Sequence, residues 1–385
     1  MRSLSFYEFF CGGGGAQAGL GEDWQCLLAN DIDQAKMRSY ILNWGAQGAV
    51  TRDVADLTTA DLPDAASLGW GSFPCQDLSA AGDKAGVDGI RSNALWPCLS
   101  LMDALRPEGR PLPMIVLENV EGLLKAAGAS FLDMICNTLT TMGYRYGVLQ
   151  IDAAMFLPQS RKRVFIVAAD AALPIPATLT MPSPAMPFHT PPIVAAMRRQ
   201  KAAPIWWRLP TTPVRSMVLA DLIEDEPSGP FPQEGLWHHP AETDRLIAMM
   251  TPVNVAKIEK AKRAGKRMVG GLYKRRRDEP GGRIQRAEVR FDGVAGCLRL
   301  ASAGGSNVQN VMIVDGPSVR SRRLSVREAA RLMGFEDSYK LPDNYVEAYD
   351  LMADGLAIPV VRHLDEHVLE PVLQASGVGL GLAAE

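Results

Sequence analysis

The sequence predicts an α/β fold, in which a sheet has helices on both faces and is joined to a smaller, loop-rich domain. Strand-like apolar runs alternate with helical segments from residue 4 to residue 168, and the first run leads into a Gly-rich turn. Prolines then become dense from Leu173 to Pro232, which indicates a domain boundary. We therefore expect one domain over residues 1–172, a second over residues 173–320, and an ordered C-terminal segment over residues 321–385.

The first predicted unit is a strand, a turn and a helix. The run from Leu4 to Phe10 leads into five residues, Cys11 to Gly15, of which four are glycine, and a helix is expected from Ala16. This order opens a nucleotide-binding half-fold. Gly12 and Gly14 match the first half of GxGxxG, but Gln17 stands where the third glycine belongs. The turn therefore suits a nucleoside-like ligand better than a dinucleotide, although a plain tight turn is an almost equal interpretation.

Acidic residues follow the next two predicted strands. Asp31 comes after the second strand and suits a ribose with two free hydroxyls. Asp33 is expected to cap the following helix. Asp53 repeats the pattern after the third strand, where it could accept a hydrogen bond from an adenine amino group. Helix capping alone remains the alternative for Asp31 and Asp33.

A cysteine follows the fourth predicted strand. The apolar run from Ser67 to Phe73 ends at Pro74, which cannot continue a ladder, and Cys75 comes next. Cys75 is thus expected at the carboxyl end of a strand, where open α/β sheets bind their ligands. Cys75 is a candidate nucleophile, and the alternative is a buried cysteine with a purely structural role. The Gly-rich stretch at residues 80–93 predicts a mobile lid.

A carboxylate and two arginines come next in the chain. The strand Pro113–Leu117 ends at Glu118, in the position that Cys75 has on its own strand. Burial would raise the pKa of Glu118 and make it a possible proton donor, while helix capping is the alternative. Arg161 and Arg163 alternate before an apolar strand and are expected on one face. Together they suit a phosphate and a base carbonyl, or else belong to a solvated loop.

Composition indicates an ordinary soluble protein with a basic middle. The 385 residues are 47% hydrophobic and 22% charged, and no apolar run approaches a membrane span. Six scattered cysteines without zinc spacing suggest free thiols in a reducing cytosol, and we expect no metal. Residues 171–320 hold 21 Lys and Arg against 13 Asp and Glu, a net charge of +8, whereas the remainder carries −11. This asymmetry predicts a polyanionic partner for the middle of the chain.

The most basic stretch of this middle domain indicates nucleic acid. Residues 257–290 carry 13 Lys and Arg against 4 Asp and Glu, including Lys274-Arg275-Arg276-Arg277. A turn with Gly304 and Gly305 follows, and Asn307 and Gln309 come after it. Lys and Arg can hold phosphates while amide side chains read base edges. A solvated basic face is the usual alternative.

Taken together, these motifs resemble the cytosine-5 DNA methyltransferase family over most of the chain. Phe10-Cys-Gly12-Gly-Gly14-Gly15 looks like the family's cofactor loop, with Glu8 where Asp is usual. Phe73-Pro74-Cys75-Gln76 resembles its catalytic loop, Glu118-Asn119-Val120 its ENV element and Gln159-x-Arg161-x-Arg163 its QxRxR motif. Each motif alone is weak, but their joint order and spacing are very specific. Leu356 departs from the common Gly-Asn of the C-terminal motif, and Cys297-Leu298 stands where Thr-Leu is frequent.

The resemblance implies a Rossmann-like class I methyltransferase sheet with helices on both faces, a loop-rich target-recognition domain, and a C-terminal segment that returns to the catalytic domain. It implies transfer of a methyl group from S-adenosyl-L-methionine to carbon 5 of a flipped-out cytosine in a specific DNA sequence, through a covalent Cys75 adduct. The implied catalytic residues are Cys75, Glu118, Arg161 and Arg163. The implied cofactor contacts are Phe10, Gly12, Gly14, Asp31, Ile32, Asp53 and Pro74. The implied DNA contacts are Gln76, Ser79, Lys274, Arg275, Arg276, Arg277, Gly304 and Gly305.

The resemblance also bears on partners and on alternatives. It implies double-stranded DNA as the partner, a bacterial or phage-encoded monomer in the cytoplasm near the nucleoid, and no membrane. A cognate restriction endonuclease that acts separately is a further expected partner. A tRNA cytosine-5 methyltransferase of the same family and an inactive DNA-binding relative remain alternative interpretations. A nicotinamide dehydrogenase is disfavoured by Gln17.

Overall fold

Seven strands pair into one sheet whose order determines where a ligand can bind. The computed structural model describes residues 4–74, 94–212, 214–227, 236–279, 282–304 and 307–377. The sheet has the order β3-β2-β1-β4-β5-β7-β6, and only β7 runs antiparallel to its neighbours. Its strands are β1 (Leu4–Phe9), β2 (Trp24–Asp31), β3 (Ala49–Thr51), β4 (Leu68–Gly71), β5 (Met114–Val120), β6 (Tyr144–Asp152) and β7 (Lys162–Asp170).

The strand order reverses between β1 and β4. From β1 the chain moves outward to β2 and β3, and it then crosses back to β4 and β5 on the other side. The carboxyl ends of these five parallel strands meet at one edge of the sheet, and ligands of open α/β sheets bind where the strand order reverses. The described candidate site residues at the ends of β1, β2, β4 and β5 therefore lie along this edge.

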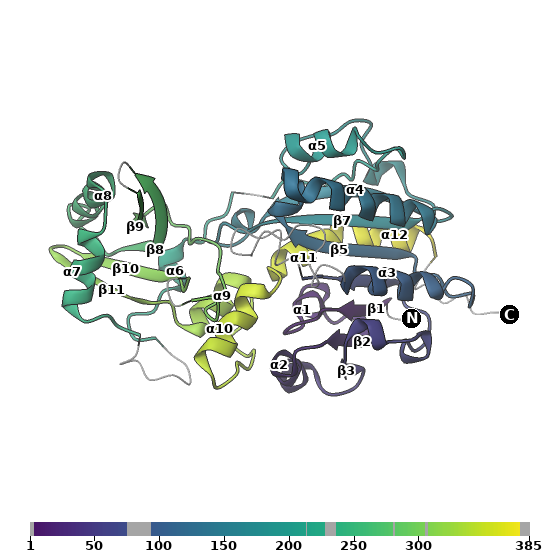
Figure 1. The fold of residues 1–385 in the computed structure, drawn as a ribbon, viewed down its shortest axis with the longest axis horizontal. Coiled ribbons are helices and arrows are strands. Elements are labelled where there is room, and N and C mark those ends of the chain that lie inside the picture. The colour runs from purple at the N-terminus through teal and green to yellow at the C-terminus, as the bar shows by residue number, and fades with distance from the viewer. Residues whose placement is uncertain are drawn as a thin grey trace. The chain divides into compact units, whose positions relative to one another are not determined.

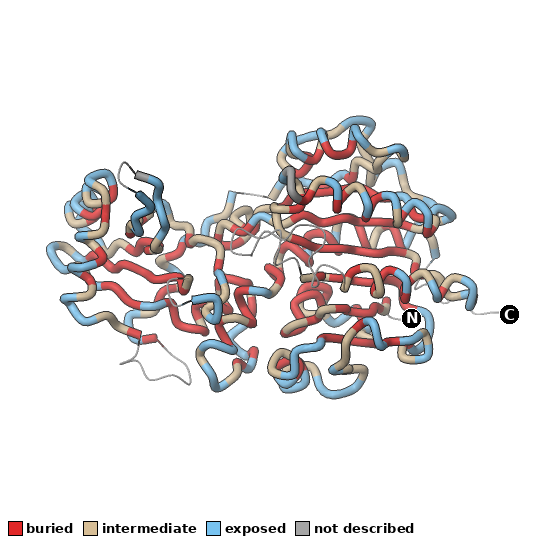
Figure 2. Tube along the Cα trace, viewed as in Figure 1, coloured by how far each residue is buried: buried red, intermediate tan, exposed pale blue. Residues whose placement is uncertain are grey.

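Helices cover both faces of the sheet, as the sequence predicts. In Figure 1, α3 and α4 lie in front of the sheet, and α11 and α12 lie behind it. Side chains of α3 and α4 pack with Tyr7, Ile115 and Val164 of the strands in one large core, and Figure 2 shows the central strands buried along most of their length. The helices of this unit are α1 (Gly15–Leu20), α2 (Gln34–Trp44), α3 (Leu95–Ala104), α4 (Ala126–Thr141), α5 (Pro191–Met197), α11 (Ile358–Leu364) and α12 (Glu370–Ala375).

A second compact unit holds a smaller antiparallel sheet. Its four strands have the order β11-β10-β8-β9. They are β8 (Met268–Glu279), β9 (Gly282–Arg290), β10 (Asn310–Asp315) and β11 (Ser318–Arg323). The helices of this unit are α6 (Leu219–Leu222), α7 (Pro240–Ala248), α8 (Pro252–Lys262), α9 (Val326–Met333) and α10 (Tyr345–Asp354). A separate core forms where Leu246 and Ile258, from α7 and α8, pack on Leu272 and Val289.

The boundaries of the two units differ from the predicted domains. Unit 1 comprises residues 1–152, 162–211 and 358–385, and unit 2 comprises residues 153–161 and 212–357. The segment after residue 172 stays with unit 1, because Ile205 N–H donates to Tyr146 O (2.7 Å) and buried Trp207 donates from Nε1 to Val167 O (3.1 Å).

The C-terminal segment is also divided differently. Residues 321–357 belong to unit 2, where a fully buried ion pair joins Arg322 to Glu328 and Tyr349 Oη accepts a hydrogen bond from Gln309 N–H. The return to the first unit starts only at Ile358. Long-range contacts decide these boundaries, and the density of prolines in the sequence does not predict such contacts.

Candidate active site

A glycine turn forms the first part of the candidate site. Phe10 and Gly12, after β1, have φ values of +58° and +54°, and Gly14 has φ +80°. A Cβ atom on Gly14 would lie 2.3 Å from the Trp44 side chain, and Trp44 Nε1 donates to Gly13 O (3.0 Å). Gly14 is therefore required both by its backbone conformation and by the close approach of Trp44. At Gly12, by contrast, a Cβ would meet no atom within 4 Å, so the backbone there faces open space.

Glu8 ties this turn to the start of α1. Its carboxylate is buried and accepts hydrogen bonds from Ala16 N–H (3.0 Å) and Gln17 N–H (3.3 Å). Burial raises the pKa of Glu8 to about 8, although the two backbone donors act in the opposite direction. Glu8, which stands where the cytosine-5 methyltransferase family usually has Asp, thus anchors the turn.

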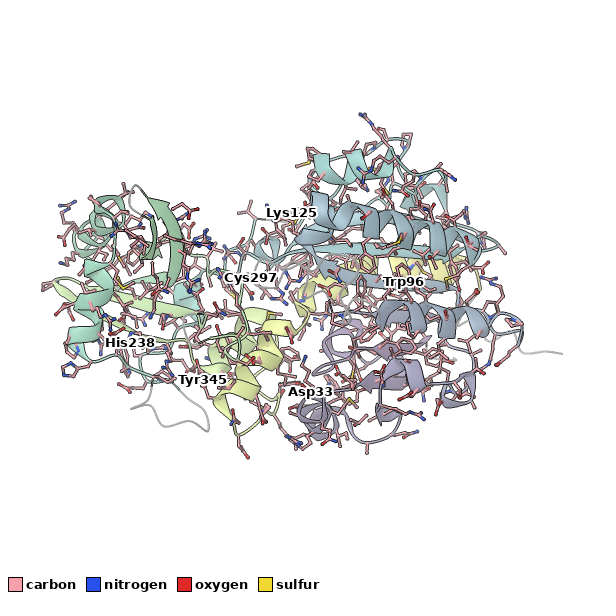
Figure 3. The ribbon with its side chains drawn as sticks, in the orientation of Figure 1. Asp33, Trp96, Lys125, His238, Cys297 and Tyr345 are labelled. Carbon is pink, nitrogen blue, oxygen red and sulfur yellow. The ribbon has the colours of Figure 1, made fainter. Side chains whose placement is uncertain are left out.

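Asp31 joins the end of β2 to the same turn. Its two carboxylate oxygens accept from Gly12 N–H (3.0 Å) and Asp33 N–H (2.9 Å). Each oxygen has further acceptor capacity, so Asp31 can still bind a ribose hydroxyl. Asp33, labelled in Figure 3, caps α2 by accepting from Ala35 N–H and Lys36 N–H, as predicted.

The residues beside Asp31 present an apolar surface and another acid. Ile32 is 66% exposed, which is unusual for an isoleucine next to a buried strand end. Asp53 Oδ1 accepts from Ala55 N–H (2.9 Å) and caps a short 3₁₀ turn at the end of β3. An open glycine backbone, an exposed aliphatic side chain and two strand-end acids fit the methionine, adenine and ribose parts of S-adenosyl-L-methionine.

Glu118 and Arg163 form an ion pair on two neighbouring strands. Glu118, inside β5 near its end, lies 3.0 Å from Arg163 Nε through its Oε1. Both side chains are largely buried, at 10% and 16% exposure. The guanidinium therefore offsets the cost of burying the carboxylate. This side of the strand end therefore carries an acidic and a cationic group next to each other.

The next residue, Asn119, holds the chain that leads to Cys75. Its Nδ2 donates to Phe73 O (3.0 Å), and the Phe73 ring packs edge-on against Phe131 of α4. The backbone just before Pro74 is thereby held against the end of β5. No separate role is predicted for Asn119 from the sequence; an amide among the last residues of a buried strand is the signal that could have found it.

These residues share one edge of the sheet. The strand register places Asn30, Phe9, Gly71 and Leu117 side by side across β2, β1, β4 and β5. Asp31 and Glu118 each follow this row by one residue. Three strand spacings of about 4.8 Å separate them, or roughly 14 Å across the sheet. The predicted cofactor acid and the predicted catalytic acid therefore lie on the two sides of the strand reversal between β1 and β4.

Several predicted site residues lie outside the described residues. They are Cys75, Gln76, Ser79 and Gly305, and the predicted lid at residues 80–93 lies outside as well. Pro74 is described and follows β4 at the sheet edge. The roles of Cys75, Gln76, Ser79 and Gly305 stay predictions from the sequence.

The structure separates Arg161 from Arg163, which corrects the expectation of a shared face. β7 begins at Lys162, so the strand alternation does not include Arg161. Arg161 is 2% exposed and donates from Nη2 to Ala353 O (2.9 Å) and Gly355 O (2.6 Å). Its guanidinium thus supports the backbone at the end of α10, in unit 2, where the C-terminal motif begins.

Four of the predicted DNA contacts of unit 2 lie on β8. Lys274, Arg275, Arg276 and Arg277 are consecutive, so they alternate between the two faces of the strand. Arg277 pairs with Glu288 of β9 through a 2.6 Å bond from Nε, which leaves its neighbours as the more available cations. Gly304 has φ +125°, a conformation that favours glycine.

The fold and the arrangement of this sheet edge define a class I methyltransferase. The model of the family of C-5 cytosine-specific DNA methylases matches residues 4–370, and the chain belongs to this family. The chain is 23% identical to the Type II methyltransferase M.NlaX of Neisseria lactamica, over 94% of this chain and 95% of that protein. It is likewise 23% identical to the Type II methyltransferase M.HhaI of Haemophilus parahaemolyticus, over 94% of each chain.

Solved structures share the fold. The Dnmt2 methyltransferase of S. pombe has a TM-score of 0.61 and 17% identity, and the alignment covers 96% of this chain and 99% of that one. The methyltransferase EhMeth of Entamoeba histolytica has a TM-score of 0.63 and 12% identity, with 97% and 99% covered. The predicted fold class and family are therefore confirmed. Within the described ranges, every helix is too short or too polar to span a bilayer.

Proposed function

We propose that this chain transfers a methyl group from S-adenosyl-L-methionine to carbon 5 of a cytosine in duplex DNA, through a covalent bond to Cys75. The Glu118–Arg163 pair carries this proposal, because it places an acid and a cation at the end of β5, beside the strand that leads to Pro74 and Cys75. An acid and a guanidinium together match the ring nitrogen 3 and carbonyl edge of cytosine.

S-Adenosyl-L-methionine supplies an electrophilic methyl group when bound. Gly12 and Gly14 would let its methionine part approach the backbone, Asp31 would accept from the ribose hydroxyls, and Asp53 from the adenine amino group. Ile32 would pack on the adenine ring. The open space at Gly12 and the exposure of Ile32 support this assignment.

Cytosine carbon 5 is a poor nucleophile, so the base needs activation. The Cys75 thiolate adds to carbon 6, and the displaced electron pair makes carbon 5 nucleophilic while Glu118 holds or protonates nitrogen 3. Arg163 binds the carbonyl oxygen and keeps the Glu118 carboxyl in place. After carbon 5 takes up the methyl group, loss of its proton restores the double bond and expels the Cys75 sulfur. Only a few per cent of a free thiol is ionised at pH 7, so the site must stabilise the thiolate.

The target base must leave the DNA stack for this chemistry, at a cost of a few kcal/mol. Unit 2, with its run of Lys and Arg at residues 257–290, would hold the duplex through its phosphates and choose the sequence. A restriction endonuclease of the same sequence specificity is the proposed separate partner, in keeping with relatives that are Type II methyltransferases.

The proposal is tested by methylation-sensitive sequencing of DNA from a methylation-deficient bacterial host that expresses this chain. We expect 5-methylcytosine at one short sequence, and none in a host that expresses Cys75→Ser at the same protein level. Purified protein offered duplex DNA and tRNA in parallel should methylate only the DNA. Methylation of tRNA alone, or of neither, would overturn the proposal.

A further inference from the structure

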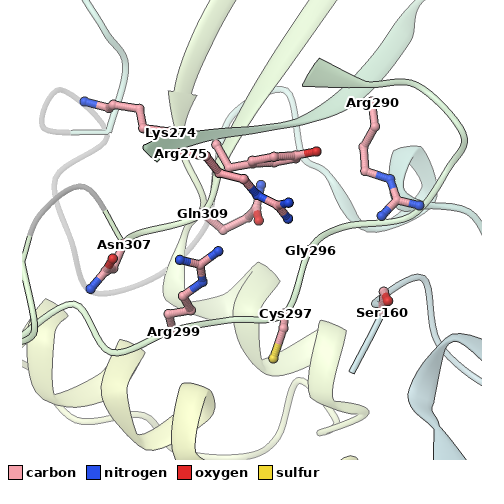
Figure 4. A pocket seen from close by; sticks show the side chains of 10 residues that line it. Ser160, Lys274, Arg275, Arg290, Gly296, Cys297, Arg299, Asn307 and Gln309 are labelled. Carbon is pink, nitrogen blue, oxygen red and sulfur yellow. The ribbon is translucent and has the colours of Figure 1, made fainter. Parts of the chain in front are cut away.

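Unit 2 contains a cationic hollow of about 190 Å³ at the base of the β8–β9 ribbon. Figure 4 shows its lining, in which Arg275 comes from β8, Arg299 from the opposite side, and Gln309 from the segment before β10. Among the residues that the structure describes, no Asp or Glu lines the hollow. Its chemistry therefore suits a partner with hydrogen-bond acceptors or negative charge.

Two arginines supply the available positive charge. Arg290, also at the hollow, is paired with Asp292 through bonds of 2.5–3.0 Å. Among the described residues, neither Arg275 nor Arg299 forms an ion pair. The Arg275 guanidinium lies 4.7 Å from the centre of the Tyr273 ring, on the same face of β8. This stacking fixes the orientation of Arg275 before any ligand binds.

Gln309 adds one acceptor to these donors. Its side chain is buried, and Nε2 donates to Leu272 O (3.1 Å) and Asn310 O (2.9 Å). The two bonds fix the amide, so Oε1 is the atom left for the hollow, and no described residue donates to it. The hollow thus presents guanidinium donors beside one fixed acceptor.

The ribbon above the hollow has a size and charge that suit DNA. β10 pairs with β8 only over Met268–Leu272, so the remainder of β8 pairs with β9 alone. Arg275 lies opposite Arg286 on one face, and Arg276 lies opposite Gln285 on the other. A two-stranded ribbon fits the major groove of B-DNA. In Figure 4 the Arg275 side chain points into the hollow, whereas that of Lys274 points away from it.

We infer that this hollow reads the major-groove edge of a G·C base pair in the target sequence, an inference that rests on the proposed function. Guanine presents two acceptors there, N7 and O6, and its cytosine presents an amino donor. Arg275 donates to N7 and O6, Gln309 Oε1 accepts from the cytosine amino group, and Arg299 holds the neighbouring phosphate. Arg275 is therefore a specificity-determining residue, and the face of the ribbon that carries it is turned to the bases.

The test compares Arg275→Gln with Arg276→Gln, a matched control that removes the same charge from the opposite face of the same ribbon. Both variants and the wild type are expressed in the methylation-deficient host, and the methylated sequences are read. Methylation rates are then measured on duplexes that carry the wild-type site or a single replaced G·C pair, at two salt concentrations.

We expect Arg275→Gln to lose discrimination at one G·C position by about 5- to 150-fold, the range for one bidentate contact. Arg276→Gln should lower the rates on all duplexes alike and keep the wild-type sequence preference. A uniform loss in both variants would make Arg275 a phosphate contact and overturn the inference. If the wild type itself methylates no DNA, the proposed function fails instead, so the two failures are distinguishable.

Discussion

Arg163 Nε lies 3.0 Å from Glu118 Oε1, across the antiparallel pair of β7 and β5. Glu118 and Arg163 are far apart in the sequence, and they form an ion pair only because β7 lies between β5 and β6 in the sheet. The sheet order therefore creates an acid with a fixed orientation at the end of the strand next to β4.

Glu118→Gln should lower turnover by about 10²- to 10⁴-fold, the usual contribution of a positioned acid or base. The amide keeps the shape of the side chain but cannot give a proton to the ring nitrogen. DNA and cofactor affinities should stay within a few-fold of the wild type, as measured by titration. Near-normal single-turnover methylation would remove the proton role of Glu118.

Arg161 and Arg163 should differ in what their replacement affects. Arg161→Ala removes a buried guanidinium that donates to Ala353 O and Gly355 O, so the free energy of unfolding should fall by about 1.5–3 kcal/mol. Arg163→Ala should mainly lower turnover, because it removes the partner of Glu118. Urea unfolding and methylation kinetics of both variants measure the two effects. An Arg161→Ala variant with wild-type stability and no activity would mean that Arg161 acts in catalysis and not in the structure.

Gly14→Ala should weaken cofactor binding and destabilise the turn. The new methyl group meets the Trp44 side chain at 2.3 Å, in addition to the left-handed strain of about 1–2 kcal/mol. Gly21→Ala is a control for backbone strain without a clash, since Gly21 has a similar φ of +82° and no atom within 4 Å of the added Cβ, although its ψ of −168° differs from the +43° of Gly14. Equal losses in both variants, by thermal unfolding and cofactor titration, would show that strain alone matters.

The stability of the protein should decrease between about pH 5 and pH 8 through Glu8. Its pKa is about 8 in the folded chain and near 4.5 when exposed, so the folded state binds a proton that the unfolded state has lost. The contribution of Glu8 to the free energy of unfolding is therefore complete below pH 4.5. Above that pH the free energy of unfolding falls by about 1.4 kcal/mol per pH unit, until Glu8 also ionises in the folded protein. Asp365, with a pKa raised by burial to about 7, acts in the same direction.

Glu8→Gln should flatten this dependence but keep the part that belongs to Asp365. Urea unfolding of the two proteins at pH 5, 6, 7 and 8 measures the difference. Parallel curves for the wild type and Glu8→Gln would mean that Glu8 binds no proton on folding. The variant's amide oxygen can still accept from Ala16 N–H, so a general loss of the turn is not expected.

The sequence by itself determined the local elements and the family. Continuous apolar runs and a Gly-rich turn place β1, β2 and β5 within a few residues. Asp33 is predicted as a helix cap because capping depends on neighbours two and three residues away. Motif order and spacing indicated the cytosine-5 methyltransferases, which the family comparison confirms. All of these signals are local or linear along the chain.

Only the tertiary structure decided the partners of the side chains. Arg161 and Arg163 look equivalent in sequence, yet β7 starts between them, and they contact different parts of the chain. Trp207 binds the proline-rich segment to unit 1, and Arg322, which donates to Glu224 O, joins the segment after residue 320 to unit 2. The hollow of Arg275, Arg299 and Gln309 likewise depends on strand pairing. Such contacts join residues far apart in the chain, and the burial that selects them is a property of the packed fold.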